Sequence, residues 1–459
     1  MKEEAGSKGR SEGERDRDRV LYSSALRRLA GITQVVSAHE GYTFHNRLTH
    51  SLETAQVARR IAQYLKEIKG NDIEKYGKTD PGYLVDPDIV EAGALAHDLG
   101  HPPFGHIAEQ ELDAAIRKKN DRDGFEGNAQ SFRIVTKLSI RRDDFRGLNL
   151  TPAALNTMLK YPWPHSAIPP NNKKWGYYST EKEHFDFARA SFAKEDRDKK
   201  TVEAEIMDWA DDIAYSVHDV EDFFRAGMIP LDELSLDGTH VARFVEEVFD
   251  RRKQEDDPLL AGDIPIEKDE AKEILEKFFG LAKRLGLRKP YQGTRADRAV
   301  LRAFTSELIG HYIRGTPLKD GEPKVQTIDL LPPDSPTRVQ IKQEAKREVL
   351  LSKELVIHYV FNNPSLVGQQ YGQRRLIREL FEIFHEAAGG DAQRQAILPV
   401  AHREYLNELG NSKSKHERET ARVRVVGDVI SSLTEQQAIA LYKRFTGYDV
   451  GTVFDPIVR

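Results

Sequence analysis

The stretch DPDIVEAGALAHDLG, residues 86–100, predicts a helix whose two ends are both marked in the sequence. Asp86 can cap the free N–H groups of the first turn, and Pro87 fits the first helical position without losing a hydrogen bond. Gly100 provides the stop signal after the last turn. The predicted helix therefore carries His97 and Asp98 side by side at its C-terminal end.

Apolar residues spaced three and four apart predict helices along most of the chain. The clearest stripes are Val57, Ile61, Leu65 and Ile68, then Ile213, Val217, Val220 and Phe224, then Leu376, Leu380 and Ile383. Two-residue alternation is scarce, and its best candidate is residues 324–330, before a proline-rich turn. Loops are indicated at residues 71–87 and 161–180. The predicted fold class is all-α, with at most a small β-hairpin.

The 459 residues are enough for two to four domains or for one large helical body. Residues 1–14 are polar and rich in Gly, Ser and charge, which predicts a disordered arm. Residues 15–230 carry the candidate chemistry. We expect residues 231–459 to form a second helical region that packs on that body.

The composition excludes several kinds of protein. The absence of cysteine rules out disulfides, thiolate metal ligands and a cysteine nucleophile, so any metal must be held by nitrogen and oxygen. The net charge of -5 gives no overall nucleic-acid signal. The chain lacks any run of 18 apolar residues, and its first residues are charged, so we expect a cytoplasmic protein without membrane contact.

The histidines are unevenly distributed. Six of the fifteen are His39, His45, His50, His97, His101 and His106. His50 begins a largely apolar helical stripe, which predicts that its imidazole points inward. Taken alone, His50 is explained better by a hydrogen-bonded core histidine than by a metal ligand.

A predicted helix further along the chain carries an acidic face. Steps of 3, 4, 4 and 3 place these residues on one side: Asp208, Asp211, Tyr215, Asp219 and Asp222. A solvated amphipathic helix is the ordinary interpretation. However, neighbouring aromatic residues indicate burial, where four aspartates repel one another unless a cation or hydrogen-bond donors compensate. A metal ion would resolve this conflict. Asp211 is a better candidate ligand than Asp212, which is turned away by about 100°.

His50, His97, Asp98 and Asp211 together make a set of two nitrogens and two oxygens for one divalent cation. Four protein ligands leave an octahedral metal two positions for water and a substrate oxygen. Manganese, iron, nickel and magnesium all suit this set, and the sequence does not choose among them.

The loop after the His-Asp pair, HPPFGHIAE at residues 101–109, returns the chain towards the predicted metal site. His106 and Glu109 are three residues apart on the next predicted helix, so the carboxylate can hold the imidazole and set its basicity. This arrangement is typical of a general acid or base. A plain capping role for Glu109 in the first turn is the alternative.

These motifs resemble the HD-domain metal-dependent phosphohydrolases, in which a His, a His-Asp pair and a distant Asp recur. More narrowly, the chain is similar to the deoxyguanosine triphosphate triphosphohydrolase-like family, and the likeness covers nearly its whole length. The matching stretches are DRDRV (16–20), NRLTHSLE (46–53), HDLGHPPFGH (97–106), FEGNAQ (125–130), LKYPW (159–163) and ADDIAY (210–215).

The resemblance implies cleavage of a deoxynucleoside triphosphate, with dGTP or several bases accepted, to the deoxynucleoside and inorganic triphosphate. It implies one divalent metal per subunit and a catalytic dyad of His106 and Glu109. The implied substrate contacts are Gln34 and Asp219 to the sugar 3′-hydroxyl, Tyr215 against the deoxyribose, and Arg47, His101, Asn128, Lys160 and Lys174 to the triphosphate. A homo-oligomer (a tetramer or hexamer), a nucleotide effector and single-stranded DNA are the implied partners.

The sequence departs from the pattern at Asp212, where some relatives carry a phosphate-binding lysine, which gives Lys160 and Lys174 more weight. Two other functions stay open at this point. One is another HD phosphohydrolase, acting on a nucleoside monophosphate or on guanosine tetraphosphate. The other is a protein that senses nucleotides or binds single-stranded DNA without catalysis.

Overall fold

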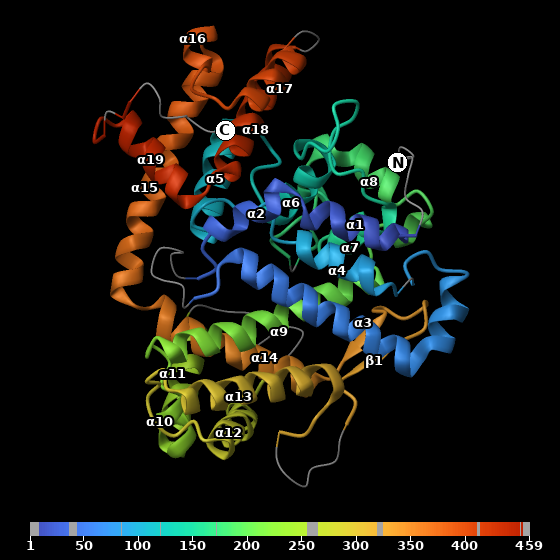
Figure 1. Cartoon of the computed structure of the whole chain (residues 1–459), viewed down its shortest axis with the longest axis vertical. Helices are drawn as coiled ribbons and strands as arrows, with labels where there is room; N and C mark the ends of the chain where they lie inside the picture. Colours follow the sequence, from blue (N-terminus) through green and yellow to red (C-terminus); the bar gives the residue numbers. More distant parts are fainter. Residues whose placement is uncertain are drawn as a thin grey trace.

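The computed structural model describes residues 9–35, 44–83, 85–119, 121–170, 172–254, 265–318, 325–410, 414–449 and 451–452. Within these ranges nineteen α-helices and one two-stranded sheet are present, which confirms the all-α prediction (Figure 1). His39 and the first eight residues of the predicted arm lie outside the described residues.

The first half of the chain forms α1 (Glu12–Leu21), α2 (Ser24–Arg28), α3 (Arg47–Gly77), α4 (Pro87–Ala96), α5 (His106–Lys118), α6 (Gly127–Arg133), α7 (Pro152–Met158), α8 (Lys182–Ala188) and α9 (Val202–Arg225). The second half forms α10 (Leu231–Leu236), α11 (Gly238–Gln254), α12 (Lys268–Leu285), α13 (Arg295–Arg314), α14 (Gln343–Val356), α15 (Pro364–Gly389), α16 (Ala392–Gln395), α17 (Val400–Gly410), α18 (Lys415–Ser432) and α19 (Glu435–Phe445). Short 3₁₀ or π turns occupy Leu29–Gly31, Ile134–Leu138, His165–Ala167, Ser179–Glu181, Lys194–Asp196 and Ile357–Phe361.

Three helices that are distant in sequence form the centre of the fold. Helix α3 packs against both α4 and α9, and α4 also packs against α9 (Figure 1). The predicted apolar stripes are buried at these contacts, as Ile61, Leu65 and Ile213 show with no exposed surface. Helix α4 begins as predicted, because the Asp86 side chain accepts a hydrogen bond from the Asp88 N–H and Pro87 follows the cap.

The sheet is the small hairpin that the sequence predicts. Strands β1 (Ile328–Leu330) and β2 (Val339–Ile341) pair antiparallel, with Ile328 opposite Ile341. β1 occupies only the last three residues of the predicted strand 324–330, and residue 324 lies outside the described part.

Two predicted boundaries differ from the structure. Helix α1 begins at Glu12, where Ser11 and Glu14 form a capping box, so the predicted disordered arm is too long by three residues. Helix α3 continues past the predicted loop start at residue 71 as far as Gly77, after a kink at Lys69. Both errors have the same cause. The start of α1 and the end of α3 depend on a few polar side chains, and such side chains are also common in loops.

Apolar packing crosses the predicted boundary at residue 230. One buried cluster joins residues of α3, α4 and α9 to residues of α11–α14. A second joins Leu112 of α5 to residues of α15, α18 and α19, such as Phe381 and Val426. In Figure 1, α15 runs along one side of the molecule from the α10–α13 end to α16–α19.

Buried polar contacts also attach the C-terminal helices to the first half. Glu435, at the start of α19, accepts hydrogen bonds from the N–H groups of Thr33 and Phe104, at 2.7 and 3.1 Å. Arg28 donates to the carbonyl oxygens of Leu433 and His101, at 3.0 and 2.8 Å. These contacts hold the loop that follows the His97-Asp98 pair.

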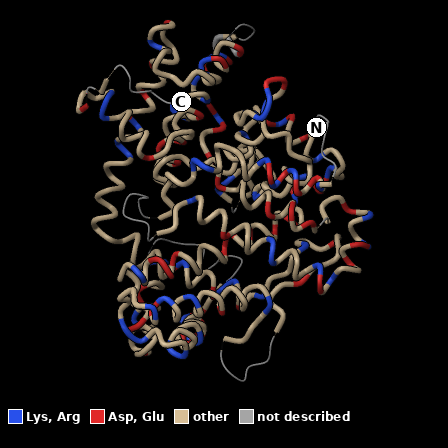
Figure 2. The backbone as a smooth tube through the Cα atoms, viewed as in Figure 1, with Lys and Arg blue, Asp and Glu red and all other residues tan. Residues whose placement is uncertain are grey.

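Charges of both signs are interspersed along the helices (Figure 2), in agreement with the small net charge. None of the helices in the described part of the chain has the length and apolar character needed to cross a membrane.

One buried carboxyl group makes stability sensitive to pH. Glu203, in the first turn of α9, is buried, and its Oε1 makes no hydrogen bond with the described residues. Burial raises the pKa of Glu203 from 4.5 to about 8. Below pH 4.5 the carboxyl is neutral in the folded and the unfolded chain, so it does not oppose folding. Between pH 4.5 and 8 it ionises more readily in the unfolded chain, so the free energy of unfolding falls as the pH rises through this range.

We expect Glu203→Gln to increase the free energy of unfolding at pH 8 by about 2–4 kcal/mol, since one pKa unit corresponds to about 1.4 kcal/mol. At pH 4.5 the gain should be much smaller, because the wild-type carboxyl is then neutral in the folded state and only half ionised in the unfolded state. Urea unfolding of both chains at the two pH values measures the difference. An equal effect at both pH values would contradict the assignment.

Candidate metal centre and catalytic cavity

His50 comes from the first turn of α3. Asn46 caps this helix by accepting a hydrogen bond from the Thr49 N–H, and a capping box fixes the turn. The His50 imidazole is almost fully buried, and its Nε2 lies 3.0 Å from Oδ1 of Asp211 on α9. Burial lowers the pKa of His50, which favours the neutral imidazole that a metal ion requires.

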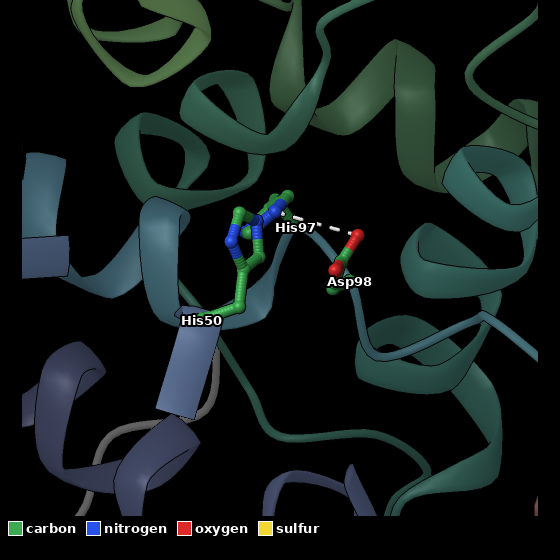
Figure 3. Close-up of side chains that lie close together, drawn as sticks. All are labelled: His50, His97 and Asp98. Atoms are coloured by element: carbon green, nitrogen blue, oxygen red, sulfur yellow. Dashed lines mark ion pairs between the residues drawn. The ribbon is translucent and has the colours of Figure 1, made fainter. Parts of the chain in front are cut away.

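His97 and Asp98 follow the last turn of α4 (Figure 3). Nδ1 of His97 lies 2.6 Å from the Ala94 carbonyl oxygen, to which it donates, so Nε2 is the nitrogen that can lose its proton and bind a metal. Nε2 is buried and makes no hydrogen bond with the residues described. It lies 3.4 Å from Oδ1 of Asp98 and 3.5 Å from Oδ1 of Asp211.

This arrangement fits a divalent cation. One ligand atom from each of His50, His97 and Asp98 lies within 4.8 Å of the others, and Asp211 adds a carboxylate oxygen close to both imidazoles. Burial acts to raise the pKa of Asp98, but the charges of His97 and Arg47 hold it well below its usual range. Burial acts against the charge of His97, yet Asp98 and Asp211 raise its pKa to about 9. The buried Asp98 and the half-buried Asp211 therefore attract positive charge to this point.

Neighbouring residues orient the candidate ligands, as they do in known metal sites. Arg47 Nη1 lies 2.7 Å from Oδ2 of Asp98, and Lys160 Nζ lies 3.0 Å from Oδ2 of Asp211. Each carboxylate thus directs its other oxygen, Oδ1, towards His97.

The imidazole and carboxylate pair predicted for α5 is present in the structure. His106 is the first residue of α5, and Gly105 before it has φ 58°, a conformation that favours glycine. His106 Nδ1 lies 2.7 Å from Oε2 of Glu109, whose Oε1 accepts a hydrogen bond from the Gly127 N–H at 2.6 Å. Among the described residues, the Glu109 carboxylate makes no hydrogen bond with the N–H groups of its own helix and instead contacts His106 and the Gly127 N–H, so a capping role does not explain it.

The electrostatics of this pair favour a carboxylate. Burial acts to raise the pKa of Glu109, but the hydrogen bond and charge of His106 lower it below its usual range. His101 joins the group, because one ligand atom each from His101, His106 and Glu109 lie within 4.8 Å of one another. Nδ1 of His101 also lies 3.1 Å from Oδ1 of Asp98, so the two clusters are adjacent.

A cavity of about 390 Å³ collects most of the predicted site residues. It is lined by Gln34, Arg47, His50, His97, Asp98, His101, His106, Asn128, Lys160, Lys174, Asp211 and Tyr215. Glu109 lies behind His106 rather than on the wall. Asp219 is not on the wall either, because it is buried one turn after Tyr215 on α9.

Cations of the chain, rather than one metal, compensate most of the acidic face of α9. Lys160 Nζ lies 2.6 Å from Oδ1 of Asp208, which Lys200 also contacts. His45 Nδ1 lies 2.7 Å from Oδ2 of Asp222. The expectation that a metal reconciles all four aspartates is therefore wrong, since only Asp211 lies at the metal cluster.

Asp212 makes a contact that the sequence did not reveal. Its Oδ1 accepts a hydrogen bond from Lys353 of α14 at 2.5 Å, and Lys353 Nζ lies 5.6 Å from the Tyr215 ring centroid. A cation from the second half of the chain thus stands next to Tyr215, although residue 212 itself is acidic.

Sequence reasoning missed several residues on the cavity wall. From the second half of the chain these are Phe361, Leu366, Gln370 and Gln373, and from the first half they include Thr33, Phe104 and Tyr161. The spacing in α15 predicts its apolar face from Leu376 onward but gives no signal for what its first turns face. Only the folded structure brings this end of α15 to the cavity.

Comparison with known proteins defines the class first. The model of the HD domain matches residues 47–216, and that of the phosphohydrolase-associated domain matches residues 339–444. The helical fold and the His and Asp cluster are those of an HD-domain phosphohydrolase. HD domains are metal-dependent, in agreement with the ligand set found here.

Curated relatives define the family. A deoxyguanosinetriphosphate triphosphohydrolase-like protein of Streptomyces coelicolor is 36% identical, covering 96% of this chain and 94% of the relative. Similar proteins of Corynebacterium efficiens and Caulobacter vibrioides are 34% and 29% identical, over 95% and 97% of this chain and 92% of each relative. The chain belongs to the family of deoxyguanosinetriphosphate triphosphohydrolase-like proteins.

Proposed function

We propose that this protein hydrolyses deoxynucleoside triphosphates to the deoxynucleoside and inorganic triphosphate, by attack of water on the α-phosphorus. The observation that carries the proposal is the convergence, around one cavity, of the metal-ligand cluster, the His106–Glu109 pair and the cations Arg47, Lys160 and Lys174. The relatives are named deoxyguanosinetriphosphate triphosphohydrolase-like proteins, and this name agrees with the proposal.

Some residues of the cavity would bind the metal and the phosphates, and others would transfer a proton. His50, His97, Asp98 and Asp211 would hold the divalent cation, which would polarise a phosphoryl oxygen and neutralise part of the substrate charge. A triphosphate carries about four negative charges, so Lys160, Lys174 and Arg47 are needed as well. We name manganese, magnesium, iron and nickel as candidate metals.

His106 would move the proton that the reaction requires. Attack on the α-phosphorus breaks its bond to O5′ of the sugar, and O5′ must gain a proton as the nucleoside leaves. With Nδ1 held by Glu109 at 2.7 Å, the imidazole can present a protonated Nε2 to that oxygen. Glu109 stabilises the imidazolium and fixes its orientation.

Tyr215 and Gln34 are the proposed contacts to the deoxyribose, because both lie on the cavity wall. A tyrosine against the sugar ring can exclude a 2′-hydroxyl by steric contact, which favours a deoxynucleotide by a few kcal/mol. His101 and Asn128 would contact the phosphates. Asp219, which does not line the cavity, is the remaining proposed contact to the sugar 3′-hydroxyl. The homo-oligomer, the effector, the single-stranded DNA partner and the cytoplasmic location stay predictions.

The test is a product assay with each deoxynucleoside triphosphate, singly and in mixtures, in the presence of Mn²⁺. We expect equimolar deoxynucleoside and triphosphate, and in ¹⁸O-water we expect the label only in triphosphate, because water attacks phosphorus. Release of pyrophosphate with monophosphate, or of single phosphate, would contradict the proposal. Activity only in mixtures would reveal an effector site.

A further inference from the structure

His101 adds a third potential metal ligand to the pair of His106 and Glu109. Its Nδ1 faces Asp98, at 3.4 Å from the carbonyl oxygen and 3.1 Å from Oδ1. Its Nε2 makes no hydrogen bond with the residues that the structure describes. One ligand atom from each of His101, His106 and Glu109 lies within 4.8 Å of the other two. None of these three residues is a ligand of the candidate metal centre described above.

The atoms of this second cluster converge beside the first residue of α6. A Cβ atom added to Gly127 would lie 3.1 Å from Nε2 of His101 and 3.2 Å from Oε1 of Glu109. The other carboxylate oxygen, Oε2, lies 2.7 Å from Nδ1 of His106. The ligand atoms of a tetrahedral zinc ion lie about 3.3 Å apart. Small side-chain movements would therefore bring all three residues into contact with one ion.

The chemistry of the second cluster favours zinc. Two imidazoles and one glutamate form a ligand set that holds Zn²⁺ in hydrolytic enzymes and leaves a fourth position open. Sites with imidazole ligands bind Zn²⁺ more tightly than Mn²⁺, which is the weakest binder of the divalent series. His106 is exposed, so an ion from solvent can reach the cluster.

The charge of Glu109 is available to a cation. In the described part of the chain, Glu109 forms no ion pair with a lysine or an arginine, and its partners are His106 and the Gly127 N–H. The nearby Lys174 has its Nζ 3.9 Å from Oε1 of Glu126 instead. A buried carboxylate that is matched only by an imidazole attracts a divalent cation.

We propose that His101, His106 and Glu109 form a second metal site, which binds Zn²⁺ and inhibits hydrolysis when it is filled. Zn²⁺ would take the lone pair of His106 Nδ1, and the proton between Nδ1 and Glu109 would leave to solvent. The imidazole would then be neutral, with its one proton on Nε2, and a neutral imidazole is a far weaker acid than an imidazolium. The inhibition rests on the proposed function, whereas the binding of Zn²⁺ does not.

The test of binding is dialysis of the full-length chain against Mn²⁺, with and without added Zn²⁺, followed by mass spectrometry of both metals. With Mn²⁺ alone we expect one equivalent of metal in the wild type. Added Zn²⁺ should raise the total to two equivalents. His106→Ala and Glu109→Gln should each stay at one, and that remaining equivalent shows that the fold is retained. Two equivalents in both variants, or one in the wild type, would overturn the proposal.

His240→Gln is the matched control for zinc on surface histidines. His240 of α11 also lies beside two acids, 3.5 Å from Glu233 and 3.9 Å from Asp237, and belongs to neither metal cluster. This variant should take up the same two equivalents as the wild type. Loss of the second equivalent in His240→Gln, with retention in His106→Ala, would assign the zinc to the surface and overturn the proposal.

The test of inhibition is the product assay on the Mn²⁺-loaded wild type at increasing Zn²⁺. Hydrolysis should fall about ten-fold or more as the second equivalent binds, because general acid catalysis contributes about 10²-fold or more. The Mn²⁺ content should stay at one equivalent. Inhibition that follows the loss of Mn²⁺, or full activity with the second site filled, would overturn the inhibitory role. A chain that hydrolyses no deoxynucleoside triphosphate at any Zn²⁺ concentration would contradict the proposed function, while the metal count would still decide the binding.

Discussion

Asp211→Asn is expected to release the divalent cation and to reduce hydrolysis by about 10³-fold or more. The variant removes a charge that lies 3.0 Å from His50 Nε2 and 3.5 Å from His97 Nε2. A bound divalent cation contributes several kcal/mol of transition-state stabilisation, and about 1.4 kcal/mol corresponds to a factor of ten in rate. Metal content after dialysis, measured by mass spectrometry, and the product assay report the two effects.

Asp212→Asn is the matched control, because the neighbouring carboxylate pairs with Lys353 instead of the imidazoles. This variant should keep the metal content of the wild type. Thermal unfolding of both variants shows whether the fold is retained. If Asp211→Asn retained a full equivalent of metal, Asp211 could not be a ligand, whatever happened to the rate.

His106→Ala is expected to lower kcat by about 10²–10⁴-fold, which is the range for general acid–base catalysis. Glu109→Gln should give a smaller loss, because Gln can still occupy the place of the carboxylate beside His106 and Gly127 without its charge. The double variant should be little worse than His106→Ala alone, since the two residues act as one unit. Steady-state kinetics across pH 5–9 measure these effects.

Metal content separates this prediction from the first one. Both dyad variants should keep the cation, because neither residue belongs to the His50, His97, Asp98 cluster. Gln110→Ala, next to Glu109 on the exposed side of α5, should retain wild-type kinetics. Unchanged kcat in His106→Ala would exclude the proposed proton transfer, and loss of metal would assign His106 to a ligand set instead.

Local signals made most of the fold predictable. Asp86, Pro87 and Gly100 mark the ends of one helix, and the structure places α4 at Pro87–Ala96. The stripe through Ile213 and Val217 is buried in α9 as expected. The end of α3 was not predictable, because the segment after Lys69 is polar and largely exposed, and such a sequence suits a loop as well as a helix.

The candidate site was predictable where spacing alone brings residues together. His97 and Asp98 are adjacent, and His106 and Glu109 are one helical turn apart, so their contacts depend on local structure. The pairing of Lys353 with Asp212 depends on how α14 packs against α9, over 141 residues of sequence, and no local pattern encodes it. The same is true of the cavity wall supplied by the start of α15.

The contacts of Glu435 have a consequence for any attempt to isolate the catalytic part of the chain. One oxygen of its carboxylate, Oε1, accepts hydrogen bonds from the N–H groups of both Thr33 and Phe104. Both of these residues line the catalytic cavity. A fragment that stops at residue 230 would contain every candidate ligand and both dyad residues. It would nevertheless lose the acceptor that holds these two walls together, so a complete set of motifs is not a complete active site.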